Sequence, residues 1–196
     1  MNKLILVDPN QALCEAWQSA FQMHDEVKIV NNVFESVKEY DCMVSAANSF
    51  GLMDGGVDLA ITKYFGNGLQ SRVQAHIMAN YNGEQPVGSS FIIGTSHAAH
   101  PYLAHTPTMR VPMSINGTDN VYLAMKAMLQ AVKSFNAQTA RIQIVLCPGL
   151  GTATGRVAPE AAAAQMALAY EYYKKPPQEI TWESAAKISR EVFAAI

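Results

Sequence analysis

The sequence predicts an α/β fold, namely a three-layer α/β/α sandwich around a central mixed sheet. The first reason is that short apolar segments alternate with amphipathic segments along the whole chain, which is typical of strands that alternate with helices. The second is that two glycine-rich loops each follow a predicted strand and precede a predicted helix. In such folds, ligands bind in the loops at the carboxyl ends of the strands.

Six segments have the pattern of strands. They are short apolar runs, and "RIQIVLC" is the clearest of them. The predicted strands are residues 4–7, 27–30, 42–45, 89–94, 102–109 and 141–147.

The helices are predicted from apolar stripes and from cap residues. Asp8 and Pro9 suit the start of a first helix, whose stripe is Leu13, Trp17 and Phe21. Thr118 could cap a helix whose apolar face is most simply a core face. The other predicted helices are residues 57–65, 69–79, 159–175 and 181–195.

Length and composition indicate one domain, residues 1–196, with a buried core. Hydrophobic residues make up 49% of the chain and charged residues 15%, which argues against disorder. The formal net charge is -2. Because proteins that bind nucleic acids non-specifically usually carry a basic patch, the composition gives no support for that function.

The three cysteines, Cys14, Cys42 and Cys147, are far apart in the sequence. An odd number at this spacing is atypical of a disulfide framework, so we expect a reducing, cytoplasmic compartment. None of them has a second metal ligand at short spacing. We expect no metal, no cofactor, no signal peptide and no membrane partner.

The two glycine-rich loops are "NSFGLMDGGVD" and "PGLGTATGR". Glycine allows several backbone N–H groups to point toward one anion, and a helix N-terminus behind each loop favours negative charge. Together the loops could hold a diphosphate from two sides. The alternative is that the glycines serve only tight turns. Neither loop is a Walker A motif or a G-x-G-x-x-G motif.

The residues "VSAAN" and "GGVDLAI", with an Asp ten residues after the Asn, resemble the signature of macro domains. "CPGLGTATG" is similar to the second phosphate loop of that family, and the resemblance covers about residues 28–175. It implies binding of ADP-ribose and, in many members, hydrolysis of ADP-ribosyl bonds.

The resemblance also implies roles for particular residues. Asn48 would hydrogen-bond the distal ribose, and Asp58 would orient or activate a water. These two are the candidate catalytic residues. The candidate ligand-binding residues are Asn32, Gly55, Gly56, Val57, Gly149, Gly151, Thr152, Ala153 and Gly155.

The sequence departs from the family pattern in three places. Asn32 stands where an Asp often reads the adenine, and Asp8 is an alternative for that role. Asp54 falls where glycine is common, and its charge would repel a diphosphate unless it points away or holds a cation. The second loop lacks the aromatic residue that usually covers the distal ribose.

Other candidate groups have open roles. His97, His100 and His105 lie close in sequence and could contact a ligand, pack, or face solvent; a metal is the least favoured reading. Arg156 could meet a phosphate or lie at the surface.

Three functions remain in competition. The first is an enzyme that removes ADP-ribose from a protein, a nucleic acid or a small molecule, with Asn48 and Asp58 at the distal ribose. The second is a binding module with the same pocket and no chemistry. The third is an interaction domain that reuses the scaffold.

Overall fold

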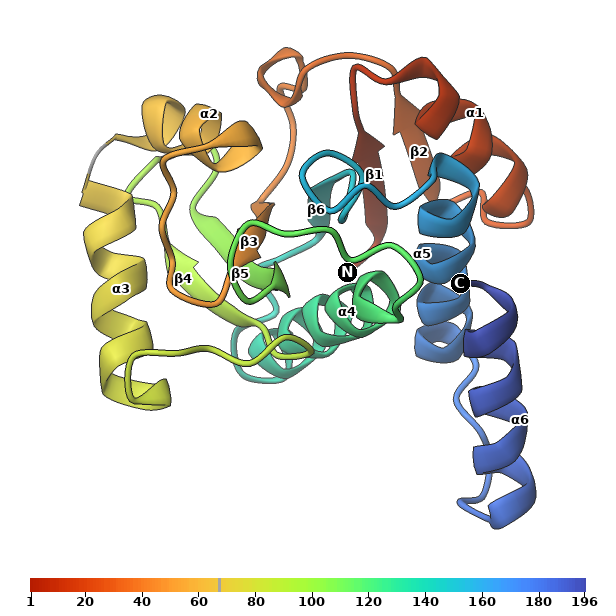
Figure 1. The fold of residues 1–196 in the computed structure, drawn as a ribbon. Coiled ribbons are helices and arrows are strands. Elements are labelled where there is room, and N and C mark those ends of the chain that lie inside the picture. The colour runs from red at the N-terminus through yellow and green to blue at the C-terminus, as the bar shows by residue number, and fades with distance from the viewer. Residues whose placement is uncertain (67) are drawn as a thin grey trace.

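The computed structural model describes residues 1–66 and 68–196 (Figure 1), and its centre is a six-stranded sheet of order β2-β1-β6-β3-β5-β4. Neighbouring strands are parallel except for β4, which pairs antiparallel with β5. The sheet is therefore mixed, as predicted. The strands are β1 (Lys3–Val7), β2 (Val27–Val30), β3 (Cys42–Asn48), β4 (Phe91–Gly94), β5 (Tyr102–Met109) and β6 (Ile144–Pro148).

Helices cover both faces of the sheet, which confirms the three-layer sandwich. They are α1 (Gln11–Ala20), α2 (Gly56–Phe65), α3 (Gly68–Tyr81), α4 (Asn120–Thr139), α5 (Pro159–Lys174) and α6 (Trp182–Ala194). A short 3-10 turn, η1 (Phe34–Ser36), lies between β2 and β3.

Successive side chains of β1 alternate between two hydrophobic clusters, one on each face of the sheet. Leu4 and Leu6 belong to the hydrophobic cluster that contains residues of α1, α4 and α5. Ile5 and Val7 belong to the cluster that contains residues of α2 and α3. Because successive side chains of a strand point to opposite faces, both faces of this strand must be apolar.

The predicted boundaries lie within about three residues of the observed ones for most elements. The prediction of Thr118 as the cap of α4 is wrong, because the N-cap is Asp119. The start of α1 also differs. The N-cap of α1 is Asn10, which accepts a hydrogen bond from the Leu13 N–H, so the prediction of Asp8 as the cap is wrong. Asp8 instead accepts from the backbone N–H of Asn10 and from that of Gly149. Its carboxylate therefore joins the end of β1 to the loop after β6.

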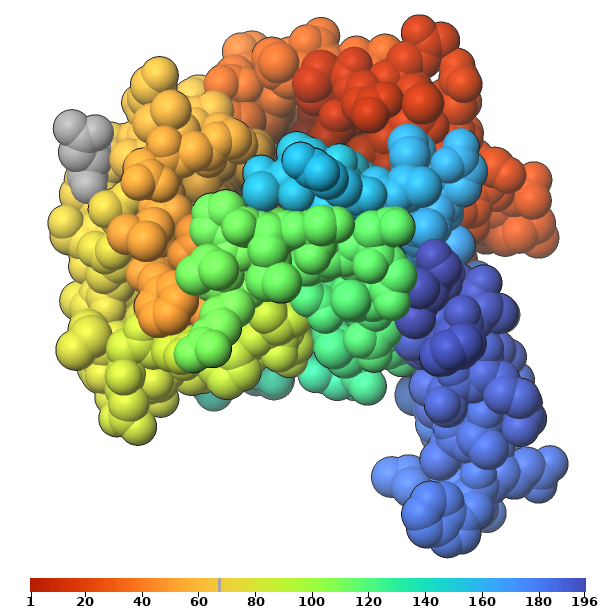
Figure 2. Space-filling view, viewed as in Figure 1, coloured from red at the N-terminus to blue at the C-terminus, as the bar shows by residue number. Residues whose placement is uncertain are grey.

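The last helix begins where the sequence predicts. Thr181 caps α6 and forms a capping box with Ser184. Figures 1 and 2 show α6 beside the C-terminal end of α5 and extending beyond the body of the molecule. Ile180, Trp182 and Phe193 are exposed there, and Val192 is buried. Within the part of the chain that the structure describes, no helix is long and apolar enough to cross a membrane.

Candidate functional site

A cavity of about 610 Å³ opens at the edge of the sheet where β1, β3, β5 and β6 end. Its wall includes the last residues of these four parallel strands and both glycine-rich loops. Parallel strands bring their carboxyl ends to one edge, so loops that lie about 100 residues apart in the sequence meet here. This is the position at which α/β proteins bind ligands.

The Asn48 side chain organises the first loop. Its Oδ1 accepts from the backbone N–H groups of Phe50 (3.0 Å) and Leu52 (3.3 Å), and its Nδ2 donates to the Leu52 carbonyl (2.7 Å). Asn48 also lines the cavity. An amide has two N–H donors, so one N–H remains beyond these loop contacts.

The N-terminus of α2 follows this loop and has no side-chain cap. Its N-cap is Gly55, and no side chain among the described residues accepts from the N–H groups of its first turn. Gly55, Gly56 and Val57 all line the cavity. Unpaired N–H groups at a helix N-terminus favour an anion, so this end of the cavity can hold a negatively charged group.

Asp58 lies in the first turn of α2 and is 5% exposed. Its Oδ1 accepts a hydrogen bond of 2.7 Å from the Ser45 hydroxyl, and the residue lines the cavity. Burial raises the pKa of the Asp58 carboxyl to about 6, and the Ser45 hydrogen bond opposes that rise. A carboxyl with this pKa can take up a proton near neutral pH, as a general base requires.

The second loop, after β6, is held tightly by backbone hydrogen bonds. The Val157 N–H donates to the Gly151 carbonyl (3.1 Å), and the Ile115 N–H donates to the Gly155 carbonyl (2.8 Å). A Cβ at Gly155 would lie 2.4 Å from the Gly151 carbonyl oxygen. Only glycine therefore fits at this position, because any side chain would collide with the backbone of the same loop.

The structure brings together all of the predicted site residues except Asn32. Asn32 is exposed and does not line the cavity; its Oδ1 accepts from the Val33 N–H (2.8 Å). Asp8, the alternative to Asn32, does line it. Arg156 is exposed and lies outside the cavity wall.

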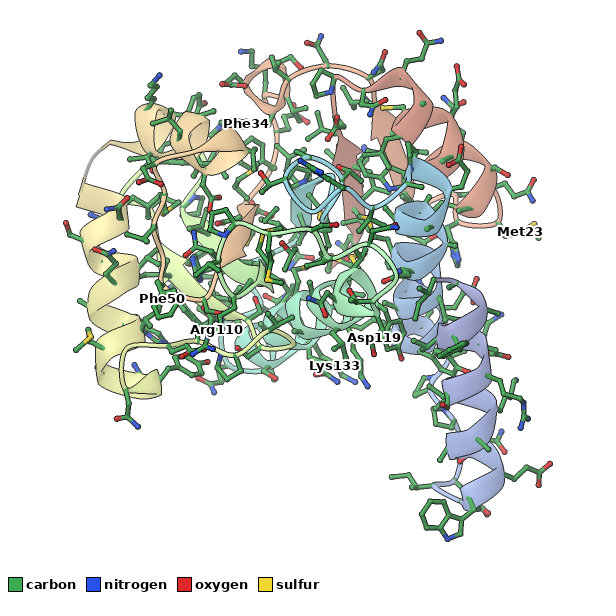
Figure 3. The ribbon with its side chains drawn as sticks, viewed as in Figure 1. Met23, Phe34, Phe50, Arg110, Asp119 and Lys133 are labelled. Carbon is green, nitrogen blue, oxygen red and sulfur yellow. The ribbon has the colours of Figure 1, made fainter. Side chains whose placement is uncertain are left out.

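Several residues of the wall were not predicted. Phe34, which is labelled in Figure 3, comes from η1. It packs edge-on against Tyr64 of α2, with 5.5 Å between the ring centroids. Pro112 comes from the segment after β5. Both lie in irregular segments, where no periodic pattern marks a side chain as inward-facing. Ser45, which lies behind the wall and bonds Asp58, was not predicted either, although it is the single hydroxyl in the apolar run "CMVSAA".

The ionisable side chains of the cavity wall are all acidic among the described residues. Asp8, Glu35, Asp54 and Asp58 line the cavity, and no Lys or Arg does so among the described residues. An anion here must be held by backbone N–H groups and the N-terminus of α2, rather than by cationic side chains.

The three histidines that lie close together in the sequence, His97, His100 and His105, do not form a metal site. His100 stacks on Tyr40 with 3.7 Å between ring centroids, and its Nδ1 lies 2.9 Å from the Tyr40 carbonyl oxygen. His97 also stacks on His100, with 5.0 Å between ring centroids, while His105 is buried beside Gln85. Across residues 1–66 and 68–196, no group of three His, Cys, Asp or Glu is arranged to bind a metal.

Sequence comparison relates the chain to known proteins. A family model described as "Macro domain" matches residues 44–166. An uncharacterised protein of Aquifex aeolicus (strain VF5) is 30% identical over 141 residues, which are 72% of this chain and 78% of that protein.

Solved structures agree in fold. The Oceanobacillus iheyensis macrodomain with ADP has a TM-score of 0.58 at 20% identity, covering 78% of this chain and 83% of that one. The macrodomain of Mycobacterium tuberculosis DarG has a TM-score of 0.57 at 16% identity, covering 68% and 82%. The Trypanosoma brucei macrodomain in complex with ADP has a TM-score of 0.55 at 14% identity, covering 97% and 69%.

Proposed function

We propose, from the premise that this chain belongs to the macro domain family, that its cavity binds ADP-ribose. The observation that carries the proposal is the meeting of both glycine-rich loops in one cavity of about 610 Å³. The N-terminus of α2 and the loop after β6 offer backbone donors to a diphosphate from two sides. Relatives of the same fold were solved with ADP or ADP-ribose.

The wall suggests how the ends of such a ligand would lie. Asn48 and Asp58 would face the distal ribose, next to Gly55, Gly56 and Val57. Thr152, Ala153 and the glycines of the second loop (Gly149, Gly151 and Gly155) would hold the diphosphate. Asp8 lines the cavity and Asn32 does not, so we place Asp8, rather than Asn32, next to the base.

We further propose that the protein hydrolyses an ADP-ribosyl bond. A water would lose a proton to the Asp58 carboxylate while its oxygen bonds to the anomeric carbon of the distal ribose. The bond to the leaving group would break, and the leaving group would depart with the electron pair and take up a proton. The pKa of Asp58, which burial raises to about 6, suits a base at neutral pH.

The spacing of three residues in a solved macrodomain supports the choice of Asn48 and Asp58 as site residues. Variants of the O. iheyensis macrodomain were solved with a glycine replaced by valine, an aspartate by alanine and an asparagine by alanine. The glycine lies seven residues after that asparagine, and the aspartate lies ten residues after it. Asn48, Gly55 and Asp58 have the same types and spacing.

A binding module is the second candidate, and the geometry of Asn48 favours it. Three hydrogen bonds commit the Asn48 amide to the first loop, so this side chain has a structural task that needs no chemistry.

The three free cysteines agree with the proposal that the protein works in the cytoplasm.

Calorimetry with ADP-ribose and AMP tests the binding proposal. We expect ADP-ribose to bind more tightly by about tenfold or more, because AMP lacks the second phosphate and the distal ribose. Equal affinities would contradict a cavity in which both loops hold the ligand.

Release of ADP-ribose from mono-ADP-ribosylated protein, nucleic acid or an acetylated ADP-ribose tests the chemistry. If the wild type releases ADP-ribose, the Asp58→Ala variant should do so about 10²–10⁴-fold more slowly. The variant should still bind ADP-ribose. If ADP-ribose binds but the wild type releases none from any of these substrates, the binding module is favoured.

A further inference from the structure

Ser45 and Asp58 form a buried pair behind the cavity wall. Ser45 lies in β3 and is 0% exposed, and its hydroxyl donates to Asp58 Oδ1 across 2.7 Å. Asp58 lines the cavity, whereas Ser45 does not. Ser45 therefore cannot touch a ligand, and any effect it has on the reaction must pass through Asp58.

The two oxygens of the Asp58 carboxylate have different surroundings. Oδ1 is fixed by Ser45, while Oδ2 has no hydrogen-bond partner among the described residues and is not sealed from solvent. A carboxylate held at one oxygen keeps the other free to accept a proton in a fixed direction.

We propose that Ser45 is a positioning residue, whose hydroxyl holds the Asp58 carboxylate so that Oδ2 faces the water that attacks the distal ribose. This inference rests on the proposed hydrolase function. The Ser45 hydroxyl also stabilises the ionised form of Asp58, because a hydrogen bond to a carboxylate favours its charge.

A histidine lies beside the pair on the neighbouring strand. His105 of β5 is the register partner of Ser45. Its Nδ1 lies 2.6 Å from Gln85 Oε1, while Gln85 Nε2 donates to the His105 carbonyl, so Nδ1 carries the proton. Burial lowers the pKa of His105 to about 3, so His105 is neutral over the working range.

The other acidic groups at the cavity are Asp8, Glu35 and Asp54, and all three line its wall. Lys63 is exposed on α2, and Arg72 of α3 donates to the Thr95 carbonyl. None of these side chains hydrogen-bonds to the Asp58 carboxylate.

The experiment follows the Asp58 carboxyl by carbon NMR and the turnover rate by a pH profile. The variants are Ser45→Ala, which removes the donor; Ser45→Cys, which fills the space with a weak donor; and Ser45→Thr, which restores a hydroxyl. Asp58→Asn assigns the resonance. Thr106→Val is the matched control, since Thr106 is a buried hydroxyl of β5 that bonds Ser90 instead.

We expect Ser45→Ala and Ser45→Cys to raise the pH at which Asp58 titrates by about one unit. The acid limb of kcat should move with it, so that the rate falls about fivefold at pH 6 and less than twofold at pH 8 from ionisation alone. KM should change little, and Ser45→Thr should recover the wild-type profile. Thr106→Val should leave the titration of Asp58 and the profile unchanged.

Two outcomes would overturn the inference. One is an unchanged titration of Asp58 in folded Ser45→Ala and Ser45→Cys, and the other is a turnover rate that stays at the wild-type value at every pH in these variants. The titration also separates this inference from the proposed function. If Asp58 titrates higher in both variants but the wild type has no turnover, the hydrogen bond controls the carboxylate and the hydrolase proposal fails.

Discussion

Asp58 is a residue whose burial opposes folding. Its pKa rises from 3.8 to about 6 because the charged form loses water. Between these pH values the native state holds more protons than the unfolded chain, so this residue makes stability fall as pH rises through that window. Above pH 6 the whole free-energy cost of burying the ionised carboxylate remains. The same carboxylate is then available in the cavity as a base.

We therefore predict that Asp58→Asn stabilises the protein by about 3 kcal/mol at pH 8 and has little effect at pH 3. Ser45 can still donate to the amide oxygen. Urea unfolding at both pH values measures the difference. Asp25→Asn, at an exposed position, is the control, and a destabilised Asp58→Asn at pH 8 would contradict the argument.

Asp54 is exposed, lines the cavity and adds to its acidic wall. Its charge would repel a diphosphate held by backbone donors alone. We predict that Asp54→Asn tightens ADP-ribose binding by about two- to fivefold at low salt, and by less at high salt because ions screen an exposed charge. Calorimetry at two salt concentrations measures this effect. Glu179→Gln, an exposed acid outside the cavity, should bind as the wild type does, and weaker binding by Asp54→Asn would indicate a cation site.

At the scale of elements, the two loops use glycine for different reasons. Gly151 has a φ of +72°, and a Cβ there would lie 2.9 Å from side-chain atoms of Ile115 and Val121. Gly55 has extended backbone, and a Cβ there would have nothing within 4 Å. The second loop is therefore fixed by the core beneath it, whereas the first loop has open space at this glycine.

This contrast predicts that Gly151→Val lowers the melting temperature by several degrees, while Gly55→Val leaves it nearly unchanged. The strained backbone and the two contacts together cost more than about 2 kcal/mol at Gly151. Differential scanning calorimetry of both variants tests the difference. Equal melting temperatures would show that the second loop can shift to accommodate a side chain.

The elements also show what the sequence could predict. Apolar runs and caps marked all six strands and the start of α6, because burial and capping leave local patterns. Asn48 and Asp58 were found by their spacing and family resemblance. The hydrogen bond from Ser45, the wall residues Phe34 and Pro112, and the place of Asp8 beside Gly149 were not found, because they depend on which strands become neighbours.

At the scale of the molecule, the cavity and α6 are separate. Every residue of the cavity wall lies between Val7 and Gly155. The helix α6 contacts α5, where the Tyr172 hydroxyl donates to Glu191, and its residues Val192 and Ile188 pack in the hydrophobic cluster that contains residues of α5. The helix therefore adds little to the walls that hold a ligand.

We predict that a chain ending at Lys175 folds and binds ADP-ribose within about twofold of the full chain, because no wall residue is lost. Its melting temperature should fall by a few degrees, since the face of α5 under α6 becomes exposed. Circular dichroism and calorimetry measure both. Loss of binding by a folded truncated chain would show that α6 acts on the cavity.

The two tryptophans lie at opposite extremes of burial. Trp17 of α1 is 0% exposed, whereas Trp182 at the start of α6 is 93% exposed. Their fluorescence is therefore separable: iodide in the solvent can quench Trp182 and cannot reach Trp17 in the native state. The emission that resists quenching reports on the core beside α1, and the quenched part reports on α6, so one unlabelled sample can follow the unfolding of both regions.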